Sequence, residues 1–158
     1  MDKMKKTYPL TMRMDRLADR LLTNCGVSRA MSGPLFQGEV SIPPMVSCKA
    51  LWDTGATTSA ISSRLVSKLG LVPSSKAFIH SPAGPLTVNV FSVDVLLSAG
   101  GEVISSLPVV SVNLDESVDF LIGMDIITLG DFAITNMDQK TTFSFRIPST
   151  ETIDFMNS

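Results

Sequence analysis

The sequence predicts an all-β protein, either a barrel or a sandwich. Short apolar runs with strand-like composition are separated by turn signals about every 8 to 12 residues, and only brief segments show helical spacing. The chain has 158 residues, 44% hydrophobic and 18% charged, so we expect one main domain with a sizeable core. Its high apolar content also favours an oligomer.

Charge and hydropathy exclude several classes of partner. The net charge is −2, and no basic stripe is interleaved with aromatic residues, so we expect no nucleic-acid partner. The apolar runs, such as residues 88–97, are too short and too interrupted to span a membrane. The basic residues 1–6 are not followed by the apolar segment of a signal peptide, so a cytoplasmic protein is expected.

The sequence offers little for metal or disulfide chemistry. Its two cysteines, Cys25 and Cys48, are better explained as reduced, partly buried thiols than as a disulfide. His80 is the sole histidine, and no Cys/His cluster is present. We therefore expect no metal site and no cofactor.

Residues 1–33 differ from the rest of the chain and are interpreted as an N-terminal leader. Apolar residues recur there at three- and four-residue spacing, which predicts an amphipathic helix. These residues are Met14, Leu17, Ala18, Leu21 and Leu22. Asn24 and Gly26 are the expected stop signals. The helix would pack on the main domain; the alternatives are a flexible leader or a remnant of a longer precursor.

From residue 34 onward, the pattern is typical of β-structure. Strands are predicted at residues 35–42, 46–52, 76–80, 86–97, 102–112, 118–122, 132–136 and 141–147. Pro43 and Pro44 cannot continue a central strand, and Pro108 marks an edge or a bulge.

Two short helices and several turns connect these strands. Residues 63–70 predict a helix with a Ser cap and Gly70 as its stop, and residues 124–129 predict another that ends at Gly130. Residues 81–85 are rich in turn formers and predict a hairpin tip. The polar residues 149–158 are expected to form a frayed tail.

One constellation of residues points to chemistry. Asp53-Thr54-Gly55-Ala56 follows an apolar strand, so the acid is held at the end of an element, where side chains reach ligands. The tripeptide is common by chance and needs context. A hairpin at residues 79–86 follows about 25 residues later, and Phe120-Leu121-Ile122-Gly123 precedes a short helix some 70 residues after the acid.

This order of motifs resembles the retroviral-type aspartic proteases, the retropepsins. Residues 121–127 are most similar to the retrotransposon, cellular and bacterial relatives, and the resemblance covers residues 36–147. It implies a small closed β-barrel with a flap hairpin over residues 34–148, the protease domain. It also implies an aspartic endopeptidase that needs no metal or cofactor.

The resemblance implies a homodimer, because hydrolysis in this family uses two carboxylates and this chain has a single Asp-Thr-Gly. Asp53 of each subunit would meet at the two-fold axis and act on a peptide or protein substrate. Thr54 would brace the two turns across the axis, and Gly55 would leave room for substrate backbone. The implied substrate-binding residues are Ala56, Thr57, Thr58, Ser81, Pro82, Ala83, Gly84 and Ile122. Gly123 would let its strand pass close behind the active-site turn.

The chain departs from the retroviral pattern in two places. Thr57 and Thr58 stand where acids are common and Met124 where Arg is common, so we expect packing and neutral hydrogen bonds to brace the turn. Asp125 is expected to cap the short helix or bond locally. Pro82 in the flap tip fixes φ and removes an N–H donor, which implies a stiffer flap.

Two other functional interpretations remain open. One is a non-catalytic or weakly active protease-like domain that serves as a dimerisation or protein-binding module. The other is an unrelated β-barrel with a small ligand, in which the Asp-Thr-Gly turn occurs by chance.

Overall fold

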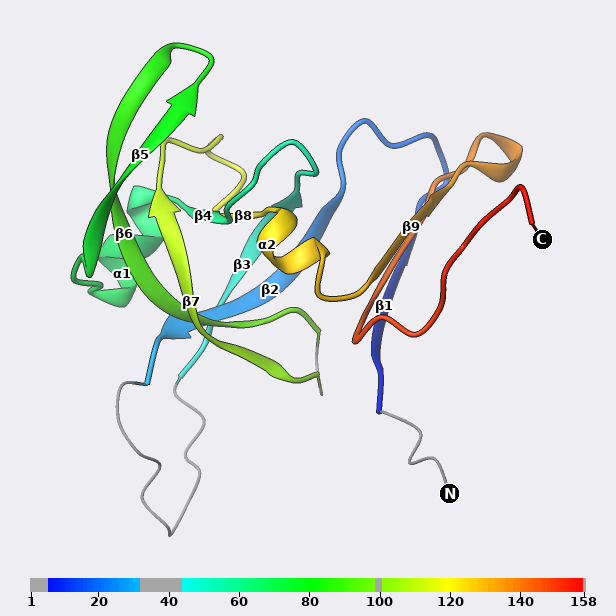
Figure 1. Cartoon of the computed structure of the whole chain (residues 1–158), viewed down its shortest axis with the longest axis horizontal. Helices are drawn as coiled ribbons and strands as arrows, with labels where there is room; N and C mark the ends of the chain where they lie inside the picture. Colours follow the sequence, from blue (N-terminus) through cyan, green and yellow to red (C-terminus); the bar gives the residue numbers. More distant parts are fainter. Residues whose placement is uncertain (1–5, 32–43, 99–100, 158) are drawn as a thin grey trace, which may run out of the picture.

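The chain folds into two β-sheets, described by a computed structural model for residues 6–31, 44–98 and 101–157 (Figure 1). The strands are β1 (Tyr8–Arg13), β2 (Leu22–Arg29), β3 (Val46–Trp52), β4 (Ala60–Ile61), β5 (Ser75–Ser81), β6 (Gly84–Leu96), β7 (Val103–Ser111), β8 (Phe120–Ile122), β9 (Asp131–Thr135) and β10 (Thr142–Ile147). The short helices are α1 (Ser63–Leu69), α2 (Met124–Ile127) and the 3₁₀ helix η1 (Met137–Gln139). The all-β prediction is confirmed.

The larger sheet closes into a barrel. Its seven strands run in the order β2-β3-β8-β4-β7-β6-β5, and an additional pairing of β2 with β6 joins the two ends of the ring. β5 extends β6 beyond the ring as one arm of a hairpin. β3 and β8 are parallel, with Trp52 opposite Ile122, so both strands end at the same edge of the barrel. This edge carries the candidate site.

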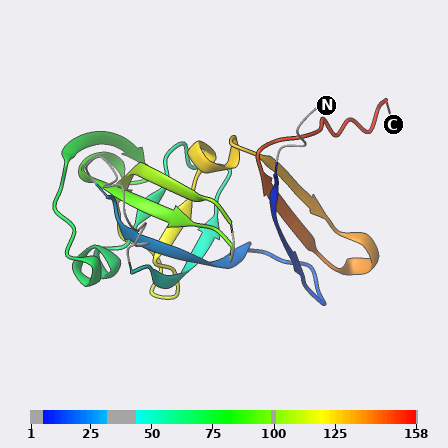
Figure 2. The same ribbon diagram turned by 90° about the horizontal axis from the view of Figure 1, so that it is seen from below.

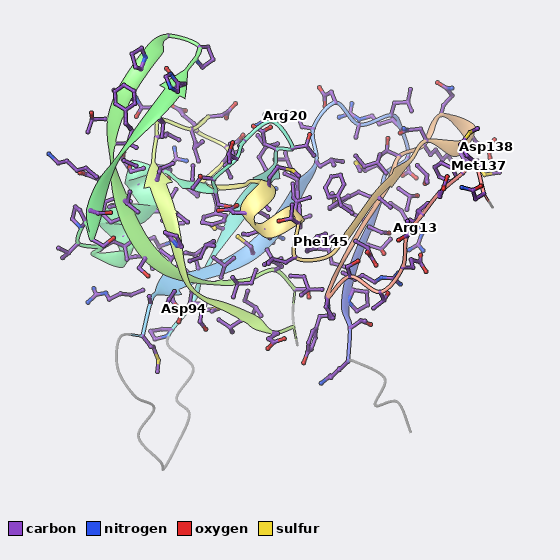
Figure 3. The ribbon with its side chains drawn as sticks, in the orientation of Figure 1. Arg13, Arg20, Asp94, Met137, Asp138 and Phe145 are labelled. Atoms are coloured by element: carbon purple, nitrogen blue, oxygen red, sulfur yellow. The ribbon has the colours of Figure 1, made fainter. Side chains whose placement is uncertain are left out.

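The smaller sheet lies beside the barrel and has the order β1-β10-β9 (Figure 2). Its inner face packs on the barrel through an aromatic cluster. The ring centroids of Phe143 and Phe145 lie 5.0 Å and 4.8 Å from that of Trp52. Phe145 points towards the barrel from β10 (Figure 3). Because Trp52 directly precedes Asp53, this cluster supports the strand that presents the acid.

The predicted N-terminal helix is wrong, because the described part of residues 1–33 forms two strands and the loop that joins them. β1 alternates between half-buried and exposed residues and pairs along its length with β10. β2 pairs with both β3 and β6, and it contains Asn24 and Gly26, the two expected stop signals. The apolar spacing that predicted the helix, from Met14 to Leu22, falls mostly in the loop between β1 and β2. The backbone of this loop bonds to Thr141 and Trp52 instead of forming helical turns, since local propensity is a weak prior.

The division of the chain at residue 33 stays a prediction, but β2 lies within the barrel of the expected protease domain. The strand predicted at residues 35–42 lies outside the described residues.

Most of the other predicted elements are confirmed. Helix α1 is capped by Ser62, whose side chain accepts a hydrogen bond from the Leu65 N–H, and it stops at Gly70, which has a left-handed φ of 58°. The guanidinium of Arg29 donates to the Leu69 and Gly70 carbonyls at that end. Strand β4 was missed, since two residues carry no periodic signal.

The sequence predicts an edge or a bulge at Pro108; a bulge is present nearby where β6 pairs with β7, at residues 105–106, whereas Pro108 itself pairs with Ser92. The register shifts between Val93 and Val95, and Ser106 has a positive φ of 55°. The buried Asp94 carboxylate accepts a hydrogen bond from the Ser106 N–H at 2.8 Å and so satisfies the irregular backbone (Figure 3).

Both cysteines are free and buried, as predicted. Cys25 and Cys48 are directly opposite each other on β2 and β3, with their Sγ atoms 3.5 Å apart. Their hydrogen bond, together with burial, holds the pKa of Cys25 well above its usual range.

Candidate active site

Asp53 lies at the end of β3, in a tight loop over residues 53–59 that leads into β4 (Figure 1). Its N–H donates to the Ile122 carbonyl at 2.9 Å, which fixes the loop against the end of β8. Its Oδ1 accepts the Gly55 N–H at 2.8 Å, and its carbonyl accepts the Ala56 N–H at 3.2 Å. These bonds hold a half-buried carboxylate at the edge of the barrel.

The strand beneath Asp53 is anchored by Trp52. The indole is 5% exposed, and its Nε1–H donates to Thr23 Oγ1 at 2.9 Å. The residue therefore belongs to the core. Asp53 is held by a strand that packs on both sheets.

Gly123 passes directly behind this loop. A Cβ atom at this position would lie 2.9 Å from both the Ala56 oxygen and the Thr58 carbonyl carbon, closer than real Cβ contacts. The next N–H along the chain, that of Met124, donates to the same Ala56 carbonyl at 2.8 Å. The close approach expected of Gly123 is confirmed.

A second connection between these segments involves Ser59 and Asp125. The Asp125 carboxylate accepts the Ser59 hydroxyl at 2.6 Å and the Ser59 N–H at 2.9 Å. The Ser59 Oγ in turn accepts the Gly123 N–H at 3.0 Å.

The Asp53 loop was expected to be braced by packing and neutral hydrogen bonds. The structure shows that the carboxylate of Asp125 also takes part. Asp125 also accepts its expected local bond, from the Ile126 N–H. Sequence reasoning missed Ser59, since no spacing signal links two residues 66 positions apart.

The structure brings together only part of the predicted site. Thr54, Gly55, Thr57 and Thr58 are exposed on the loop, and Ala56 is half-buried. Ile122 is fully buried in the core rather than open to a substrate, because it faces inward on β8. It serves the site through its carbonyl, which holds Asp53.

The predicted hairpin tip lies between β5 and β6. The Ser81 hydroxyl donates to the Gly84 carbonyl at 2.8 Å and accepts the Ala83 N–H, so the tip is held by its own atoms. Pro82 and Ala83 are exposed. The hairpin and the Asp53 loop project from the same end of the barrel (Figure 1). Among the described residues, no hydrogen bond joins the tip to the loop.

An apolar cavity lies elsewhere in the molecule. It has a volume of about 220 Å³ and lies between β1, β10 and the β6–β7 hairpin, with Leu10, Leu97 and Phe145 in its lining. Asp53 does not line it. The single chain thus presents the acid at an open edge, and over the described residues no cluster of His, Cys, Asp or Glu could hold a metal ion.

Comparison with known proteins agrees with this geometry. The family model described as aspartyl protease matches residues 40–126, more than half of the chain. A retropepsin-like aspartic protease from Rickettsia conorii is a structural match with a TM-score of 0.52 and 15% identity, covering 90% of this chain and 94% of that one.

A second structure is a Legionella pneumophila protein of unknown function, with a TM-score of 0.34 and 16% identity over 52% of this chain and 74% of that one. No curated protein sequence is matched. In the described part of the chain, no helix is long and apolar enough to cross a membrane. By its family match and by its barrel, this chain belongs to the aspartyl proteases and has a retropepsin-like fold.

Proposed function

We propose that the chain is an aspartic endopeptidase that works as a homodimer, with one Asp53 from each subunit. The observation that carries this proposal is the position of Asp53, held at an open edge of the barrel by backbone bonds to Ile122 and within its own loop. The chain has one Asp-Thr-Gly, and hydrolysis by paired carboxylates needs two. A symmetric dimer places the same loop of both copies at the two-fold axis.

The chemistry follows from two carboxylates at contact distance. Both cannot ionise easily, so they share one proton, as carboxylate pairs in aspartic proteases do. One Asp53 takes a proton from the water as it attacks the peptide carbonyl carbon, while the other protonates the carbonyl oxygen. The tetrahedral intermediate collapses with cleavage of the C–N bond, and a carboxyl group donates the proton that the leaving amine needs.

The neighbouring residues position the substrate in this proposal. Thr54 bonds across the two-fold axis, and Gly55 leaves room for substrate backbone. Ala56, Thr57 and Thr58 form the floor of the substrate site, since both threonines are exposed on the loop. The tip from Ser81 to Gly84 closes over the substrate and excludes water. Phe78, 66% exposed on the same hairpin, adds an apolar contact for a peptide.

The test is cleavage of a denatured protein or a peptide library between pH 4 and 7, with and without pepstatin. Wild-type cleavage should be pepstatin-sensitive, and Asp53→Asn should reduce it by at least about 1,000-fold, since it removes the acid–base pair. The matched control is Asp138→Asn, an exposed acid at the tip between β9 and β10 (Figure 3). It should leave cleavage unchanged, because Asn also tolerates the positive φ found there.

Light scattering of the same samples supplies the second arm. The active species should have twice the 17.0 kDa mass of the chain. Cleavage that survives Asp53→Asn, or an active monomer, would overturn the proposal. A stable dimer that cleaves nothing would instead support the protein-binding alternative.

A further inference from the structure

Ser59 and Asp125 form a directional chain of hydrogen bonds behind the Asp53 loop. Ser59 is fully buried, and its single hydroxyl proton goes to Asp125 Oδ1 at 2.6 Å. The oxygen of that hydroxyl is therefore the acceptor for the Gly123 N–H at 3.0 Å. The Ser59 N–H donates to the other carboxylate oxygen of Asp125 at 2.9 Å. The direction of each hydrogen bond therefore fixes the direction of the next one.

A carboxylate suits this position better than an amide. The partners of the Asp125 side chain are all donors, namely the Ser59 hydroxyl, the Ser59 N–H and the Ile126 N–H. An ionised carboxylate only accepts, whereas an Asn amide would turn an NH₂ group towards one of these donors. An Asn side chain at position 125 would have the same shape but one acceptor fewer, so one of these donors would be left unpaired.

The chain of bonds reaches Asp53 through the backbone. Ile122, which accepts the Asp53 N–H, directly precedes Gly123. At the other end of the loop, the Asp125 N–H donates to the Thr57 carbonyl at 3.2 Å. Residues 54, 55, 57 and 58 are exposed and Ala56 is half-buried, so little side-chain packing fixes the loop between its ends. The bonds to the segment 122–125 set its position.

We infer that Ser59 and Asp125 are positioning residues for Asp53, which hold its loop against the end of β8 at the distance that the paired carboxylates require. The inference rests on the proposed function. In a homodimer, a displaced loop shifts both Asp53 carboxylates, one in each subunit. A displacement of about 1 Å in a catalytic group can cost about 100-fold in rate.

The test compares this pair with a second Ser–Asp pair in the same barrel, which likewise joins a buried serine to a half-buried aspartate. The Ser62 hydroxyl donates to Asp119 at 2.9 Å, away from the Asp53 loop, and Asp119 also binds Arg64. Asp125→Asn should lower kcat about 10- to 100-fold with KM within about 3-fold of wild type, because a small displacement of the loop disturbs the pairing of the two carboxylates, while the hairpin residues that also contact the substrate are unchanged. Asp119→Asn should leave kcat unchanged.

A second pair of variants keeps the test decisive if Asp125→Asn fails to fold. Ser59→Ala removes the hydroxyl with little change in volume and should reproduce the loss of kcat, whereas Ser62→Ala should not. The inference is overturned if Ser59→Ala has the same kcat as its control Ser62→Ala. The same holds for Asp125→Asn and its control Asp119→Asn, provided that Asp125→Asn folds.

Amide hydrogen exchange separates this inference from the proposed function. The Gly123 amide should exchange at least about 10-fold faster in Ser59→Ala than in Ser62→Ala, because it loses the hydroxyl oxygen that accepts its hydrogen bond. If wild type cleaves nothing, the proposed function fails, and the exchange rates still decide whether the bonds hold the loop. Equal exchange in both variants would overturn the inference.

Discussion

Gly123 lies against the backbone of the Asp53 loop, and no side chain fits there. The atoms that a Cβ would meet belong to the Ala56 and Thr58 backbone, which cannot swing aside as a flexible side chain can. The same segment carries the carbonyl of Ile122 that holds Asp53. A shift of this backbone therefore moves the acid as well as the strand.

Gly123→Ala is expected to lower the free energy of unfolding by about 1–3 kcal/mol, because overpacking forces the two backbones apart. Urea denaturation measures the change. Gly26→Ala is the control, since the nearest atoms to its Cβ would be side-chain atoms, the Met45 Sδ at 3.1 Å and the Met45 Cβ at 3.3 Å, and not backbone. Equal stability of the two variants would contradict the argument from close approach.

At the scale of elements, the C-terminal segment is attached to β9 by Asp131. The carboxylate accepts hydrogen bonds from the Ser149 hydroxyl, from the Thr150 N–H at 3.0 Å and from Arg146 Nε at 2.7 Å. The bond from Ser149, then those from Thr150 and Arg146, hold the pKa of Asp131 far below its usual range. The predicted tail thus begins with residues that are tied to the smaller sheet.

This attachment should depend on pH. An Asp with a lowered pKa contributes stability that is fully present above its unfolded pKa of about 3.9 and is lost as the pH falls through the lower folded value. Hydrogen exchange of the Thr150 amide should therefore stay slow down to about pH 4 and accelerate below it, relative to the intrinsic rate.

Asp131→Asn should release this segment at every pH between 5 and 7. Asp154→Asn is the control, because Asp154 bonds only to the nearby Met156 and Asn157 in the described structure. It should leave the protection of the Thr150 amide unchanged. Equal protection in wild type and Asp131→Asn would refute the attachment.

At the scale of the whole molecule, the barrel depends on an N-terminal strand. β2 lies between β3 and β6 and closes the ring, and it contributes the buried side chains of Cys25 and Val27 to the core. β1 forms one edge of the smaller sheet, whose aromatic residues pack on Trp52. Both sheets therefore include residues from the predicted leader.

Deletion of residues 1–29 should abolish the cooperative thermal transition, because it opens the ring and leaves β3 and β6 with unpaired edges. Circular dichroism and a thermal melt measure the loss. Deletion of residues 152–158, which include no strand in their described part, is the control and should keep the transition. A cooperative melt of the shorter chain at the wild-type temperature would support a dispensable leader.

Local signals determined much of the fold and the core of the site. Ser62 and Gly70 mark the ends of α1 because capping involves residues a few positions apart. β3 and the hairpin of β5 and β6 follow from short-range alternation and turn residues. Asp53 and Gly123 were identified by their motifs, whose residues are adjacent in sequence.

Only the tertiary structure decided the features that join distant residues. β1 pairs with β10, more than a hundred residues later, and the loop after β1 bonds to Thr141 and Trp52, so the helical spacing of residues 14–22 forms no helix. Ser59 and Asp125 meet because β3, β4 and β8 are neighbours in the barrel. Such contacts have no periodicity in the sequence, since they are set by which strands pair and in which register.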